Sequence, residues 1–238
     1  MKNNLILFII CYLLLNSISL AETFRFETSK IGIKDSGNSI FAEDGKAISS
    51  NNNLEIISDK FEYIKNSNIL KADGNGLAFI RSENLKIKFE SAIIDENLSI
   101  IKANGNITMY HLDENLIIKT SDIVYDKKNN LVSSTTKSVI TDKLENIYSV
   151  DKFSYEIDKN LLKVENVSFK DKINNNFKTS LAYINTKTNR LFGKDVNINL
   201  SNSSFEKNNE PRLKGNSVTN DEDYTEITKG IFTTCKRR

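Results

Sequence analysis

The chain has 238 residues, and its 33 Lys and Arg against 31 Asp and Glu leave a formal net charge of +2. A balance this close to zero gives no indication of a nucleic-acid partner, which a strongly basic chain would give. Hydrophobic residues make up 39% of the chain, with 13 Phe, no Trp and one Pro, which is enough apolar surface for an extended core.

The first 21 residues have the pattern of a secretory signal peptide. Lys2 supplies the positive start, an apolar run extends from Leu5 to Leu15, and Ser19-Leu20-Ala21 forms a small-x-small cleavage site. The alternative of a retained membrane anchor is disfavoured because the run is well short of the ~20 residues that span a bilayer. We therefore expect residues 1–21 to be removed on export, Cys11 among them.

A repeat of about thirty residues organises the rest of the chain. The stretch from Asn68 to Ile80 reappears as Leu98 to Met109, and apolar marker residues follow at nearly even spacing. These markers are Tyr63, Ile94, Tyr125, Tyr155 and Tyr183, separated by 31, 31, 30 and 28 residues. A unit too small to bury its own apolar face must stack on its neighbours. The spacing predicts about six stacked two-strand units.

Within each unit, apolar and charged residues alternate with a period of two, which is typical of half-buried strands. The alternation slips by one residue near Asp59, Glu90, Asp122 and Asp151, and a slip requires a bulge or a bend. Gly74 and Gly105 indicate a second corner. We expect two bends per unit, outward acids that hydrogen-bond at the bend, and an all-β, slit-like β-jellyroll or β-solenoid with a flattened, V-shaped cross-section.

The alternation also predicts which side chains point inside. They form either a dry, self-filled core or a lengthwise apolar groove that holds acyl chains. The inside set comprises Ile56, Phe61, Tyr63, Leu70, Leu85, Ile87, Phe89, Ile94, Ile101, Ile107, Met109, Ile118, Ile123, Tyr125, Val132, Phe153, Tyr155 and Leu162.

The two ends of the mature chain differ from the repeats. Alternating Phe24, Phe26, Ile31 and Ile33 predict an edge strand at the start of the repeat domain, residues 22–200. Residues 201–238 are expected to form a linker and terminal strands. Cys235, an odd cysteine in an exported chain, pairs with another chain, pairs with sequence absent here, or stays free.

Residues for catalysis or metal binding are sparse. There is one histidine, His111, which we expect to face solvent just past a strand end. Phosphate-loop, CxxC, HExxH and GxSxG motifs are absent. The recurring acids lack the spacing of calcium ligands. The sequence therefore predicts a protein that is not an enzyme and needs no cofactor or metal.

The repeat resembles a known family. The units LEIISDKFEYIKNSNILKADGNGLAFI and LIIKTSDIVYDKKNNLV are similar to the OstA-like repeat of lipopolysaccharide-transport bridge proteins in Gram-negative bacteria. The tail, PRLKG at Pro211–Gly215 and the segment Tyr224–Cys235, is similar to the end of the periplasmic domain in the family of outer-membrane lipopolysaccharide-assembly (LptD) proteins.

The resemblance implies several properties. The inside set would line a groove for the acyl chains of lipopolysaccharide. The strand carrying Phe24, Phe26, Ile31 and Ile33 would pair with the periplasmic bridge protein by strand augmentation. Cys235 would match a family cysteine that forms a disulfide in or near an outer-membrane barrel, whose plug lipoprotein would be a further partner. The barrel is absent, so we expect this chain to be a fragment or a truncated product.

The predicted function is non-enzymatic lipopolysaccharide transport in the periplasm and at the cell outer membrane. The alternatives are a soluble periplasmic bridge subunit of the same pathway, a closed β-helix adhesin or polysaccharide enzyme, and a structural spacer with a sealed core.

Overall fold

The computed structural model describes residues 24–51, 53–170, 174–201, 205, 209–220 and 224–235. The predicted signal peptide, residues 1–21, lies outside the described residues. Regular structure in the described part is β-strand apart from three short 3-10 turns, which confirms the all-β prediction. The strands are β1 (Phe24–Lys34), β2 (Ser39–Ser49), β3 (Leu54–Ile64), β4 (Ile69–Ile80), β5 (Leu85–Asp95), β6 (Ile100–His111), β7 (Leu116–Asp126), β8 (Leu131–Ser134), β9 (Ser138–Thr141), β10 (Ile147–Val150), β11 (Lys152–Glu156), β12 (Leu161–Lys170), β13 (Asn176–Asn185), β14 (Leu191–Asn199), β15 (Arg212–Asn220), β16 (Thr225–Thr228) and β17 (Ile231–Thr233).

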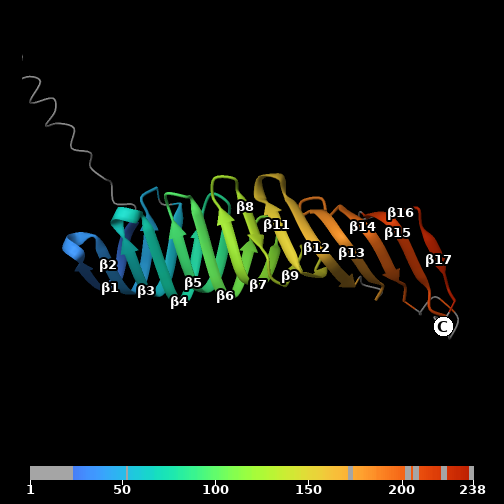
Figure 1. Ribbon diagram of the computed structural model, residues 1–238, viewed down its shortest axis with the longest axis horizontal. Coiled ribbons are helices and arrows are strands. Elements are labelled where there is room, and N and C mark those ends of the chain that lie inside the picture. The colour runs from blue at the N-terminus through green and yellow to red at the C-terminus, as the bar shows by residue number, and fades with distance from the viewer. Residues whose placement is uncertain are drawn as a thin grey trace, which may run out of the picture.

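The strands form one long antiparallel sheet in which each rung pairs with the next along the chain (Figure 1). Three rungs are split into two short strands: β8 and β9 lie beside β7, β11 and β10 lie beside β12, and β16 and β17 lie beside β15. The predicted repeat of two strands is therefore an antiparallel hairpin, and successive hairpins extend the same sheet.

Asparagine residues close the hairpin turns. A positive φ between 45° and 52° is found at Asn68, Asn84, Asn115, Asn130 and Asn160. Asn enters this left-handed region more readily than other residues with a side chain. The sequence between the strands therefore fixes where each strand reverses.

Each long strand bends near its middle, where the sequence predicts a slip. The register shifts between Ile57 and Lys60, between Asp73 and Gly76, and again in β5 and β6. The predicted acids make hydrogen bonds there: Asn75 Nδ2 donates to Asp59 Oδ2 (2.8 Å), and Asn166 Nδ2 donates to Asp151 Oδ2 (2.9 Å). Gly74 has φ +83°, as expected for the second corner. These contacts confirm the two predicted bends.

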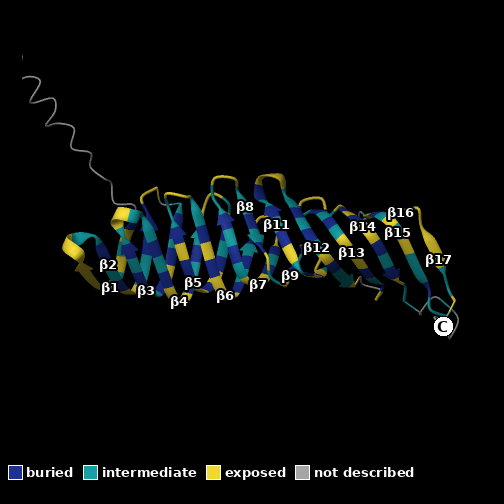
Figure 2. Ribbon diagram, in the orientation of Figure 1, coloured by how far each residue is buried: buried dark blue, intermediate teal, exposed yellow. Residues whose placement is uncertain are grey.

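The bends divide the sheet into two arms, which we name by their hairpins. Arm 1 contains the strand halves that end at hairpins 35–38, 65–68, 96–99, 127–130, 157–160 and 186–190. Arm 2 contains the halves that end at the connection between β2 and β3 and at hairpins 81–84, 112–115 and 142–146. Farther along the sheet, the halves of β12–β15 that continue this pairing, and β17, belong to arm 2, whereas β16 belongs to arm 1. Buried residues recur on rung after rung along the length of the sheet (Figure 2). Contacts such as those between the rings of Phe24 and Tyr63 place this apolar core between the two arms. We call the space between the arms the slit, and the line where the two hairpin rows approach each other its mouth.

The sheet continues beyond Leu200, the expected end of the repeat domain. β15 pairs with β14 along its whole length, from Arg212 opposite Asn199 to Asn220 opposite Leu191. β16 and β17 in turn pair with β15. The described part of residues 201–238 thus contributes two further rungs to the same sheet.

Candidate functional site: the slit between the arms

Every member of the predicted inside set points into the slit. Their exposed fractions lie between 0% and 5%. The alternation of the sequence therefore predicts the inner face correctly for these side chains, on both sides of each bend where the alternation shifts by one residue. Because each of them is packed by its neighbours, the slit is filled along its length by protein side chains. Their role in lining a lipid groove stays a prediction.

Aromatic contacts join the two arms at the N-terminal end of the slit. Phe24 on arm 2 meets the ring of Tyr63 on arm 1 edge to face, with ring centroids 5.5 Å apart. Phe26 and Phe61 make a similar contact at 5.9 Å. Such pairs are favourable beyond the area they bury. The arms are thus held together by side chains, whereas backbone hydrogen bonds connect strands within each arm.

Tyrosines of arm 1 place their hydroxyl groups at the mouth. The Tyr63 hydroxyl donates to Asn68 Oδ1 (3.3 Å) and the Tyr125 hydroxyl donates to Asn130 Oδ1 (2.9 Å), in each case to the Asn of the adjacent turn. Burial raises the pKa of Tyr125 above its ordinary value, and the nearby carboxylates of Glu83, Asp158 and Asp126 raise it further. The tyrosines of arm 1 therefore contribute neutral hydroxyl groups, paired with neutral amides, at the mouth above an apolar interior.

His111 occupies the mouth midway along the sheet, and the prediction that it faces solvent is wrong. It is 5% exposed, and its Nδ1 lies 2.7 Å from the Tyr155 hydroxyl, which in turn lies 3.3 Å from Thr186 Oγ1. His111 belongs to arm 2, and the other two belong to arm 1. The sequence contains a signal for this burial, because His111 follows the inward residues Ile107 and Met109 at intervals of two on the same strand. Burial lowers the pKa of His111, and Glu114, Asp113 and Glu83 partly oppose this.

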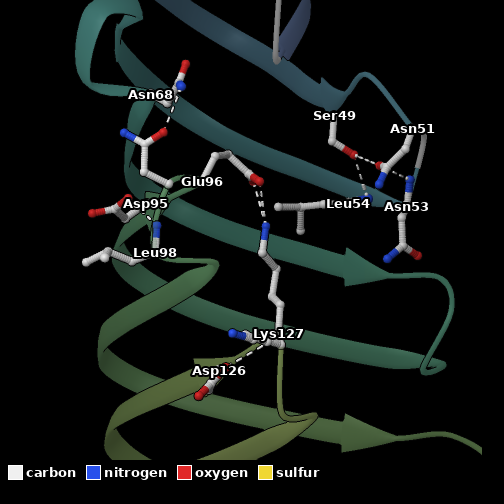
Figure 3. A network of polar contacts seen from close by, with 12 residues as sticks. Ser49, Asn51, Asn53, Leu54, Asn68, Asp95, Glu96, Leu98, Asp126 and Lys127 are labelled. Carbon is white, nitrogen blue, oxygen red and sulfur yellow. Dashed lines mark hydrogen bonds and ion pairs between the residues drawn. The ribbon is translucent and has the colours of Figure 1, made fainter.

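A hollow of about 400 Å³ lies across the mouth in the N-terminal half. One side is formed by Ser49, Asn51, Asn53, Leu54 and the hairpin at Ser82 and Glu83, and the other by Glu96, Ser99, Tyr125, Lys127 and Asn130. Figure 3 shows the Lys127 side chain extending to Glu96, which lies in hairpin 96–99 of the same arm. Both residues lie opposite the turn that contains Ser49 and Asn51. The Lys127–Glu96 ion pair was not found from the sequence, because the two residues lie 31 positions apart without a local motif.

Both ends of the slit expose inner apolar side chains. Ile31 and Ile33 of β1 pair with the buried residues Ala42 and Ile40 and so lie on the inner face, yet they are 60% and 65% exposed. Phe232 of β17 pairs with Leu213 and is 53% exposed. β1 pairs only with β2 among the described strands. The predicted edge strand is therefore at the end of the sheet, and a further rung would cover its inner apolar residues.

Three further features concern the cysteine, metal-binding groups and membrane-spanning helices. Cys235 is an exposed free thiol, and no disulfide joins it to another described residue. The described residues contain no group of three or more His, Cys, Asp or Glu side chains that could hold a metal ion. No helix in the described part of the chain is long and apolar enough to cross a membrane.

These features define an all-β module with one antiparallel sheet folded into two arms around a continuous apolar slit. Neither a protein-family model nor a curated protein matches the chain. Among solved structures, the chain is similar to LptH of Pseudomonas aeruginosa, the LptA homologous periplasmic component of the lipopolysaccharide transport device. The TM-score is 0.39 and the sequence identity 14%, over 44% of this chain and 76% of that chain. The fold class itself rests on the strands and their pairing register.

Proposed function

We propose that the chain is a non-enzymatic module that shields the acyl chains of lipopolysaccharide in its slit and passes them along the sheet toward the outer membrane. The observation that supports this function best is the uninterrupted apolar interior, which continues from β1 to β15 and ends in exposed apolar side chains at both ends. Each CH₂ group moved out of water contributes about 0.8 kcal/mol. A slit built from similar rungs offers a sliding lipid a series of similar sites.

Entry of a lipid requires the arms to part. The arms meet through side chains, such as the rings of Phe24 and Tyr63 and the hydrogen bond between His111 and Tyr155. Separation at the mouth would break such contacts and leave the strand-to-strand ladder of each arm intact. Acyl chains would then replace the side-chain contacts across the slit.

The partners follow from the two ends. The free edge of β1 is suited to strand augmentation by the periplasmic bridge protein, with Ile31 and Ile33 covered by the incoming rung. At the other end we place the outer-membrane barrel and its plug lipoprotein, with Cys235 in a disulfide near the barrel. The proposed function also includes export to the periplasm, removal of residues 1–21 and a specific role in outer-membrane assembly.

The experiment is photocrosslinking in cells from single inner positions, Phe89, Ile107 and Tyr125, with Lys88 as the matched outward control on the same strand as Phe89. We expect lipopolysaccharide adducts at the three inner positions and none at Lys88. Absence of adducts at all three, in protein shown to be folded and exported, would contradict the transport function.

A second function, a rigid structural spacer, is favoured by one observation. The inner side chains are already packed to exposed fractions of 5% or less, which leaves the interior filled. The spacer predicts no lipid adduct at any inner position. The same crosslinking experiment therefore separates the two functions.

A further inference from the structure

The outer face of arm 2 is formed by two rows of side chains that cross the sheet from β4 to β17. The pairing register defines each row, since directly paired residues point to the same face. The row near the mouth contains Phe79, Lys86, Tyr110, Ile117, Thr141, Ile147, Lys170, Asn176, Asn199, Arg212 and Thr233. The row near the bend contains Leu77, Lys88, Thr108, Lys119, Val139, Ser149, Ser168, Lys178, Asn197, Lys214 and Ile231.

These two rows contain basic residues and no acidic residue. The corresponding rows on the outer face of arm 1 contain four acids and three bases: Asp95, Asp126, Glu156 and Glu226 against Lys71, Lys102 and Lys163. Carboxylates border the arm 2 face in hairpins such as 112–115 and at the bends, where Asp59 and Asp151 are hydrogen-bonded to asparagines. Toward the N-terminus the two rows continue to Glu55 and Glu27, which form ion pairs with Arg81 and Lys46. The near-neutral chain is therefore strongly asymmetric in charge.

The lysines of this face are available to a partner. None of Lys86, Lys88, Lys119, Lys170, Lys178 and Lys214 forms an ion pair with another described residue, whereas Arg212 pairs with Glu210 at 3.1 Å. Apolar side chains lie between them: Val139 is 41% exposed and Ile147 57% exposed, and the ammonium group of Lys86 lies over the ring of Phe79. Cations interspersed with aliphatic and aromatic side chains suit an interface that is charged at its surface and apolar beneath.

We propose that the outer face of arm 2 binds an anionic phospholipid surface. The rows extend over eleven strands, roughly 50 Å at the usual strand spacing of about 4.8 Å, so the charge is spread over a length that matches a surface better than a single small anion. The exposed Val139 and Ile147 favour a lipid surface over nucleic acid, which offers phosphates without an accessible apolar layer. This inference is independent of the slit and of the function proposed for it.

The test is co-sedimentation of the mature full chain with vesicles of phosphatidylglycerol and phosphatidylethanolamine, compared with vesicles of phosphatidylcholine. We expect binding to the anionic vesicles at low salt, weakening as salt screens the charges, and little binding to phosphatidylcholine. Lys88→Glu with Lys119→Glu should lower the partition coefficient at least tenfold, because it replaces two cations near the anionic surface with two anions.

The matched control is Lys102→Glu with Lys163→Glu on the outer face of arm 1, which changes the net charge equally. Thermal unfolding and circular dichroism verify that both variants are folded. An equal loss of binding in the control variant would show that only net charge matters and would overturn the proposal. Failure of the wild-type protein to bind anionic vesicles, or binding of a DNA duplex through Lys88 and Lys119 without vesicle binding, would also overturn it.

Discussion

At the scale of single residues, the mouth of the slit is the most unusual part of the molecule. His111, Tyr155 and Thr186 come from two arms and three rungs, and their polar atoms satisfy one another where water is excluded. A buried polar group without a partner costs about 1–3 kcal/mol, so this chain of hydrogen bonds fixes how the arms meet. Burial raises the pKa of Tyr155 to about 12, which keeps its hydroxyl neutral throughout the physiological range.

The buried histidine predicts a pH dependence of stability. Burial lowers the pKa of His111 in the folded protein, so the unfolded chain binds the proton more readily. The stabilisation is complete above the unfolded pKa of about 6.5 and is lost as the pH falls below it. We expect the wild-type Tm to drop from pH 7.5 to 5.5 by more than the Tm of His111→Gln. Equal drops in both proteins would show that His111 is not the titrating group.

At the scale of elements, adjacent strands fit together through paired large and small residues at the bends. Gly76 of β4 pairs with Phe89 of β5, and the Phe89 ring lies where a Cβ of residue 76 would be. The ring therefore covers the backbone of the neighbouring strand. This close approach explains why a glycine follows the corner at Gly74.

Gly76→Ala should reduce the free energy of unfolding by about 1–3 kcal/mol, because the added methyl group displaces the packed Phe89 ring. The measurement is denaturation in urea. Gly32→Ala is the control, since a Cβ at Gly32 would meet no atom within 4 Å and its backbone needs no positive φ. A similar loss in both variants would argue against the contact with Phe89 as the cause.

At the scale of the whole molecule, the sheet is nearly one-dimensional. Each rung pairs with the rung before and the rung after, so stability is approximately a sum over neighbouring rungs. The slit has no terminal cap in the described residues, and Ile31, Ile33 and Phe232 stay exposed at its ends. Shortening the sheet should therefore remove rungs without destroying those that remain.

A chain of residues 22–130, which ends after the turn that accepts the Tyr125 hydrogen bond, should fold and unfold cooperatively. Its denaturant m-value should be smaller than that of the full chain, roughly in proportion to the surface exposed on unfolding. A chain ending at Asn104 is the control, because it cuts β6 at its bend and removes Met109, the β6 residue that pairs with Ile87 of arm 2. An unfolded 22–130 chain would contradict the rung-by-rung description.

The sequence by itself determined the strands, the inward set and the bends. Period-two alternation makes strand parity a local property, and the slips at Asp59 and Glu90 and the glycines at 74 and 105 act on their immediate neighbours. The tertiary structure decided what the rungs bring together. It placed His111 against Tyr155 and Lys127 against Glu96, and it gathered the lysines of arm 2 on one face. Contacts between rungs depend on the pairing register and on how the two arms pack against each other. Local alternation of apolar and polar residues specifies neither.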